Sequence, residues 1–153
     1  MRRIMLACLG LAAIATSASA EEWGFVRASA NDVRLFYGVP ESEDVTVSVI
    51  CDPARKRLRV AAFTLPAGAK PGQRLRIALT AGASSAIYDG TVVRDKVHGG
   101  LYVEAAAPAD TRIFDLLRLP ASLTIAVGSS QEKVPLQGAA DAVAKMQQAC
   151  LGR

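Results

Sequence analysis

The sequence has one histidine and three cysteines, and aromatic residues make up only 5% of it. A Ser–His–acid triad could use only His98 as its base, and no Gly-x-Ser-x-Gly turn is present to carry a nucleophile. The scattered carboxylates and cysteines lack the spacing of zinc or calcium sites. The glycine-rich stretch at residues 68–72 is not followed by the Lys-Ser/Thr of a phosphate-binding loop. These absences predict a protein that is not an enzyme and holds no cofactor and no metal.

Long apolar runs are also missing, and the one at residues 4–15 is too short to cross a bilayer as a helix. It follows two arginines and precedes Ala18-Ser19-Ala20, which are the three parts of a secretory signal. We therefore expect a signal peptide at residues 1–20, one β-rich domain at residues 21–153, and a periplasmic or secreted protein. The alternatives are an uncleaved N-terminal anchor and lipidation of Cys8.

The net charge of +4 overstates how basic the exported domain is. Two of the 18 basic residues lie in the predicted signal, while the 14 acidic residues all follow it. The remaining domain is close to charge balance, whereas a nucleic-acid-binding domain has a concentrated basic face. The sequence therefore predicts no nucleic-acid partner.

Cleavage of the signal leaves two cysteines, Cys51 and Cys150. An even pair in an exported chain predicts a disulfide. Two cysteines cannot fill a zinc shell, and no Cys-x-x-Cys redox motif is present, so metal and redox interpretations are weaker. Cys51 lies on the inward face of a strand at residues 45–51, and Cys150 on the apolar stripe of a helix at residues 139–150, which supports their pairing.

Short segments of alternating apolar and polar residues predict a mainly β fold. The strands fall at residues 23–29, 33–37, 45–51, 57–64, 74–80, 101–105, 123–127 and 133–136, with a weaker hairpin turning at Asp89-Gly90. Pro135 marks an edge strand. Helical spacing predicts a short helix at residues 110–117, with Asp110 as its N-cap, and the C-terminal helix. We expect an antiparallel β-sandwich or partly closed barrel with both helices packed on it.

The most distinctive predicted surface is basic. Residues 45–51, 57–64 and 74–80 are expected to form a meander of three antiparallel strands with one solvated face. In it, Val45 and Val47 face inward and four arginines line the outer face of two neighbouring strands. These arginines are Arg57, Arg59, Arg74 and Arg76. Arginine binds carboxylate and phosphate groups, so this face predicts an anionic envelope component or an acidic protein as partner, and Phe63 on the same face favours binding. The alternative is that the arginines only keep the sheet soluble.

The second half of the chain resembles a known family in the order of its segments. These are Leu101-Tyr102-Val103-Glu104, a short helix ending in Leu116-Leu117, the strand at residues 123–127, and Pro135-Leu136-Gln137-Gly138-Ala139. They resemble bacterial envelope proteins of the invasion-associated locus B family. The stretch at residues 34–41 followed by Cys51 is similar to uncharacterised exported bacterial proteins with a C-terminal helix ending in cysteine. The resemblance implies a periplasmic β-sandwich with a role at the envelope, and it supplies no catalytic residues.

Three functions follow as hypotheses. The first is a non-enzymatic periplasmic or secreted protein that binds an envelope protein or an anionic envelope component. The second is a secreted inhibitor of a hydrolase, which would present a rigid loop such as the one at residues 66–72 with Lys70, or the loop around His98. The third is an enzyme that depends on His98.

Overall fold

The computed structural model describes residues 20–97 and 99–152 of the chain. Predictions about residues 1–19, including Cys8, and about His98 fall outside these residues. Within them, nine strands and two helices follow one another in the order β1 (Glu22–Ser29), β2 (Asp32–Gly38), β3 (Val45–Asp52), β4 (Arg57–Ala62), β5 (Arg74–Ala81), β6 (Ser84–Arg94), β7 (Leu101–Pro108), α1 (Arg112–Leu117), β8 (Ser122–Val127), β9 (Ser130–Pro135) and α2 (Ala139–Leu151).

The strands form one antiparallel sheet in the order β1-β2-β3-β4-β7-β6-β5-β8-β9, and this sheet is not closed. The mainly β, antiparallel fold with a short helix and a C-terminal helix is therefore confirmed. The predicted meander is wrong in one respect, because β3 pairs with β4 but β4 pairs with β7 and not with β5. The connection between β4 and β5, residues 63–73, is longer than the two to five residues of a typical hairpin loop. This length lets β5 pair with β6 and β8 instead of with β4.

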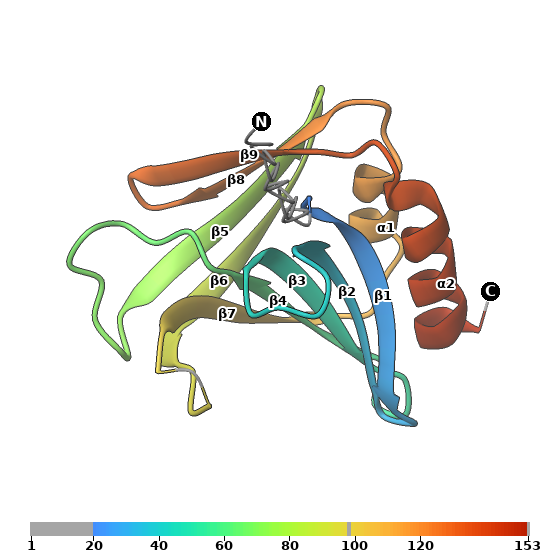
Figure 1. Ribbon diagram of the computed structural model, residues 1–153, viewed down its shortest axis with the longest axis horizontal. Coiled ribbons are helices and arrows are strands. Elements are labelled where there is room, and N and C mark those ends of the chain that lie inside the picture. Colours follow the sequence, from blue (N-terminus) through green and yellow to red (C-terminus); the bar gives the residue numbers. More distant parts are fainter. Residues whose placement is uncertain (1–19, 98, 153) are drawn as a thin grey trace, which may run out of the picture.

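The sheet bends around a single core, and the two helices lie together beside it (Figure 1). Each of the nine strands contributes at least one buried apolar residue to this core. Its largest fully buried side chains include Phe114 of α1, Met146 of α2, Leu35 of β2 and Leu79 of β5. Burial of apolar surface from both helices and all strands is what holds the curved sheet in this shape.

The two edge strands of the sheet are linked by a side chain. The indole Nε1 of Trp23 in β1 donates a hydrogen bond to the carbonyl oxygen of Pro135 in β9, at 2.7 Å. Trp23 also packs against Tyr37 of β2, with ring centroids 5.4 Å apart. The position of Pro135 in the outermost strand β9 confirms the predicted edge, where proline costs no ladder hydrogen bond.

A disulfide joins Cys51 of β3 to Cys150 of α2, with 5.9 Å between their Cα atoms. Both residues are buried, and Cys51 has no exposed surface. The apolar stripe of α2 packs toward β1, β2 and α1, as its spacing predicts. The predicted pairing of the two cysteines is therefore confirmed, and it anchors the C-terminal helix to the third strand.

The predicted hairpin at Asp89-Gly90 is wrong, because both residues lie within the continuous strand β6 and pair with β5. The turn between β5 and β6 falls earlier, at Gly82, whose φ is +57°. Gly90 is needed because β7 packs closely against it: a Cβ at this position would lie 2.8 Å from the Val103 side chain and 3.0 Å from the Glu104 carbonyl oxygen. Glycine inside a strand often marks such a contact.

The short helix α1 begins slightly later than predicted. Thr111 occupies the N-cap position, while the Asp110 carboxylate accepts a hydrogen bond from the Arg112 backbone N–H at 3.1 Å. No helix within the described residues is long and apolar enough to cross a membrane.

Candidate functional site

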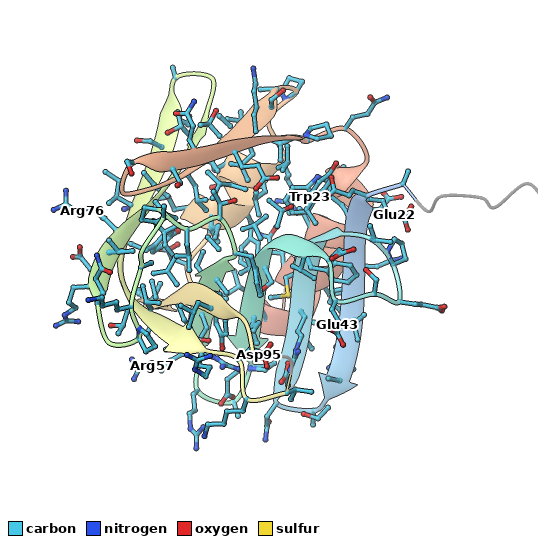
Figure 2. The ribbon with its side chains drawn as sticks, turned by 60° about the vertical axis from the view of Figure 1, so that its left-hand side comes forward. Glu22, Trp23, Glu43, Arg57, Arg76 and Asp95 are labelled. Atoms are coloured by element: carbon cyan, nitrogen blue, oxygen red, sulfur yellow. A yellow bond between two sulfur atoms is a disulfide. The ribbon has the colours of Figure 1, made fainter. Side chains whose placement is uncertain are left out.

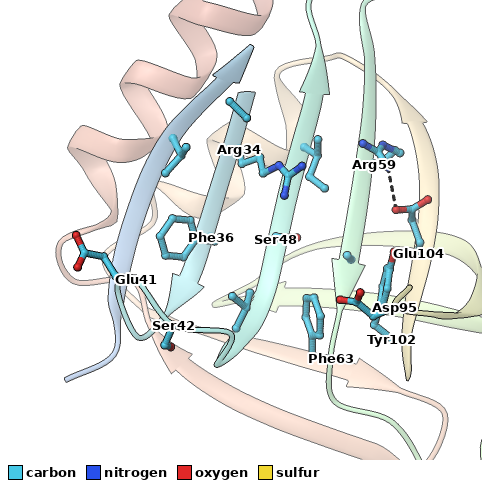
Figure 3. A pocket seen from close by; sticks show the side chains of 15 residues that line it. Arg34, Phe36, Glu41, Ser42, Ser48, Arg59, Phe63, Asp95, Tyr102 and Glu104 are labelled. Atoms are coloured by element: carbon cyan, nitrogen blue, oxygen red, sulfur yellow. Dashed lines mark hydrogen bonds and ion pairs between the residues drawn. The ribbon is translucent and has the colours of Figure 1, made fainter. Parts of the chain in front are cut away.

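A hollow of about 520 Å³ lies on the outer face of the sheet, over β1, β2, β3, β4 and β7 (Figure 3). It is on the opposite side of these strands from the core. The loop between β2 and β3 borders it with Glu41 and Ser42, and Asp95 borders it from the connection between β6 and β7. Its volume is in the range of small-molecule sites.

Small side chains form the floor of the hollow. The strand register places Phe36, Ser48, Ala61 and Glu104 side by side across β2, β3, β4 and β7. Ser48 and Ala61 are only 8% and 1% exposed, although they do not face the core. Ser48 and Ala61 leave space above the sheet, while the bulkier residues around them form walls.

Aromatic side chains form two of these walls. Phe63 and Tyr102 stack with ring centroids 5.2 Å apart and an interplanar angle of 24°. On the other side, the Phe36 ring leans over Gly24, where a Cβ would lie 2.3 Å from the ring. Gly24 thus lets Phe36 lie flat against β1. Rings that stack on each other or lie flat against the sheet offer a rigid apolar surface to a ligand.

Two arginines line one end of the hollow. Arg34 of β2 and Arg59 of β4 stand on either side of Ile50 in the register. Arg34 forms two hydrogen bonds to the Asp32 carboxylate, each 2.8 Å long. Arg59 donates one to Glu104 at 3.3 Å. Both arginine side chains are about half exposed, so their ion pairs leave them accessible from the hollow.

The charged groups around this end shift the pKa values of their neighbours. Hydrogen bonding to Arg34 lowers the pKa of Asp32, and the charges of Arg34 and Arg59 lower it further against the opposing effect of burial. Burial raises the pKa of Tyr102, and the nearby carboxylates of Glu104 and Asp95 add to the increase. Asp32 is therefore firmly ionised and Tyr102 firmly protonated at neutral pH, so the tyrosine can donate a hydrogen bond.

The two ends of the hollow differ in charge. Glu41 and Asp95 lie at the end formed by loops. At the arginine end a second hollow of about 470 Å³ adjoins the first, sharing Ile50 and Arg59 and adding further basic groups. Its charged lining is Arg55, Arg57, Arg59 and Asp52. The surface is therefore acidic at one end and basic at the other.

The predicted arginine face is divided by the topology. Arg57 and Arg59 lie on β4, and Arg74 and Arg76 on β5, with β7 and β6 between them. Figure 2 shows Arg57 and Arg76 at separate places on the molecule. Arg74 and Arg76 line a different hollow over β5 and β8, where Arg76 is paired with Asp89 at 3.5 Å. The prediction that these four arginines share two neighbouring strands is therefore wrong.

Sequence reasoning placed Arg59 and Phe63 on the outer face, and the structure finds both in the hollow. It missed the roles of Arg34, Phe36 and Tyr102, which come from strands far apart in the sequence. It also placed Val45 on the inward face, whereas Val45 lines the hollow because the register shifts between Tyr37 and Gly38. The alternation of residues 57–63 was the only signal in the sequence that pointed here.

The other candidate elements lie elsewhere. Lys70 is in the connection between β4 and β5, where its backbone N–H bonds to the Gln73 side chain at 3.1 Å. In the part of the chain that the structure describes, no three histidine, cysteine or carboxylate side chains are grouped so that they could hold a metal ion.

No family model, curated protein or solved structure matches the chain. The resemblance to the invasion-associated locus B family therefore stays a prediction.

Proposed function

We propose that the chain is a non-enzymatic binding protein of the bacterial envelope, periplasmic or secreted, and that the hollow over β1, β2, β3, β4 and β7 is its binding site. The observation that carries the proposal is the composition of this hollow. A small-residue floor, aromatic walls and a few converging polar groups are the features by which proteins hold small ligands.

The polar groups around the hollow suit recognition. Arginine and tyrosine donate hydrogen bonds in fixed directions, and their ion pairs with Asp32 and Glu104 hold the arginine side chains in place. A site whose groups are already oriented loses less entropy when a ligand binds. The ordered surroundings of Arg34 and Arg59 therefore favour binding as the role of this surface.

An extracytoplasmic location is supported by two observations. The first is the signal-like N-terminal sequence. The second is the disulfide between Cys51 and Cys150, because such bonds persist in oxidising compartments. The resemblance to envelope proteins agrees with both.

The proposal is tested by filling the hollow. Ala61→Leu puts a larger side chain on its floor, and Ala78→Leu is the matched control, because Ala78 lies on the outer face of β5 beside a different hollow. The wild type and both variants are incubated with a small-molecule extract of bacterial envelopes, desalted, and examined by native mass spectrometry. Matching thermal transitions show that all three are folded.

We expect the wild type and Ala78→Leu to retain the same compounds and Ala61→Leu to lose them. Retention of the same compounds by all three proteins would place the binding site elsewhere. Retention of no compound by the wild type would contradict a small-molecule binding role.

A further inference from the structure

We infer that the ligand of this hollow is an elongated apolar carboxylate, with its carboxylate between Arg34 and Arg59 and its apolar body over the small-residue floor toward the β2–β3 loop. The inference rests on the proposed function and names the ligand class of the same site. The observations that carry it are the register of the two arginines, the aromatic walls and the opposite charges of the two ends.

The two arginines have hydrogen-bonding capacity beyond their ion pairs. A guanidinium group carries five N–H donors. Asp32 is bound by Nε and Nη2 of Arg34, and Glu104 by Nη1 of Arg59. Arg34 reaches over β3 in the direction of Arg59 (Figure 3). Because both side chains also line the hollow, a carboxylate placed there over Ile50 can accept hydrogen bonds from both.

The charge of the surroundings favours an anion at this end. The adjoining hollow contributes Arg55 and Arg57 against the single carboxylate of Asp52. Asp32 and Glu104 balance the charges of Arg34 and Arg59 themselves. The groups of the adjoining hollow therefore supply the net positive field around this arginine pair.

The rest of the hollow suits an apolar body. Beyond the arginines lie Ala61 and Ser48, and then the stacked rings of Phe63 and Tyr102. Along β7, Tyr102 is four residues from Ala106, which is the register partner of Arg59. At about 3.4 Å per residue, this is a distance of roughly 14 Å. The ligand is therefore extended and lies along the strands.

The far end determines the orientation. Glu41 borders the hollow there, so a carboxylate at that end is repelled. A ligand with a carboxylate at each end should bind less well than one with a single carboxylate. A ligand that carries an ammonium group at its far end should bind better.

Isothermal titration calorimetry of the full mature chain tests these consequences with four ten-carbon probes: decanoate, decanol, decanedioate and ω-aminodecanoate. We expect decanoate to bind at least tenfold more tightly than decanol, which has the same apolar chain. We expect decanedioate to bind more weakly than decanoate, and ω-aminodecanoate to bind more tightly than decanoate. Equal affinity for decanoate and decanol, or preference for decanedioate over decanoate, would overturn the inference.

Variants locate the carboxylate. Arg59→Gln should reduce the affinity for decanoate about tenfold and leave decanol unchanged. Arg76→Gln is the matched control, because Arg76 is also an exposed arginine with one carboxylate partner and lies outside the hollow, and it should alter neither. In Arg59→Gln, the Glu104 carboxylate loses its partner and could itself repel the ligand. The double variant R59Q/E104Q removes both charges, so any loss of affinity that it shows is due to the loss of Arg59. Wild-type affinity for decanoate in the double variant would overturn the inference.

The two proposals fail in different ways. If the wild type retains compounds that Ala61→Leu loses, while decanoate does not bind, the binding function stands and the carboxylate assignment falls. If no compound is retained and no probe binds, both fall.

Discussion

Removal of the disulfide between Cys51 and Cys150 should cost a substantial part of the stability of this domain. The bond closes a loop with a sequence separation of 99 residues. In the chain-entropy description, a cross-link over about 100 residues stabilises a protein by about 4.7 kcal/mol, because it limits the conformations of the unfolded chain. A domain of this size has a total stability of about 5–15 kcal/mol. We therefore expect C51A/C150A to lose about 3–5 kcal/mol.

The folded structure itself should change little in this variant. Helix α2 keeps an apolar face that is buried independently of the sulfur atoms, including Val143 and Met146, which have no exposed surface. The disulfide therefore acts mainly on the unfolded state. An unfolded chain without the cross-link is more expanded and exposes more surface, so the urea m-value should increase.

Urea unfolding followed by far-UV circular dichroism measures both quantities. Met146→Ala with the disulfide intact is the control, because it removes core packing and should cost about 2–5 kcal/mol without changing the m-value. A loss below about 1 kcal/mol in C51A/C150A, with an unchanged m-value, would refute the reasoning and mean that the unfolded chain is already compact.

Three further predictions concern single features. Gly90→Ala should destabilise the fold by about 1–3 kcal/mol because its Cβ meets Val103 and the neighbouring backbone, whereas Gly100→Ala, with open space around it, should be nearly neutral in the same urea assay. Asp32→Asn should cost up to about 1 kcal/mol at pH 7. Because the folded-state pKa of Asp32 lies below its unfolded value of about 3.9, its ion pair stabilises the fold above that value, and this contribution is lost as the pH falls through the lowered pKa. The stabilities of the variant and the wild type should therefore converge at acidic pH. Burial raises the pKa of all three tyrosines, so absorbance at 295 nm should show them ionising at higher pH in the folded protein than in the protein unfolded in urea.

Local periodicity was sufficient to predict most elements of the fold. The alternation at residues 45–51 and the apolar stripe at residues 139–150 each depend only on neighbours in the sequence. The disulfide could be predicted from these two patterns, because each placed its cysteine on a buried face. Side-chain direction within an element is set by backbone geometry, so it can be predicted without knowing the tertiary fold.

The order of strands in the sheet could not be predicted in the same way. The alternation of Arg57 and Arg59, and of Arg74 and Arg76, gives the outward face of each strand but not its neighbours. The pairing of β4 with β7 depends on contacts between segments more than forty residues apart, such as Arg59 with Glu104. Asp89-Gly90 misled for a related reason, because only the position of β7 shows why a glycine is needed there.

The same limitation explains why most of the candidate site was missed. On β3, Thr46, Ser48 and Ile50 alternate with the core-facing valines and so indicate an ordinary solvated face. In the structure Ser48 is nearly buried, because Phe36 from β2 and the stacked pair of Phe63 and Tyr102 rise on either side of it. A small residue creates a hollow only when larger residues from neighbouring strands surround it. The site is thus a property of the strand order, and it exists here because β7 lies beside β4 and brings Tyr102 and Glu104 to Phe63 and Arg59.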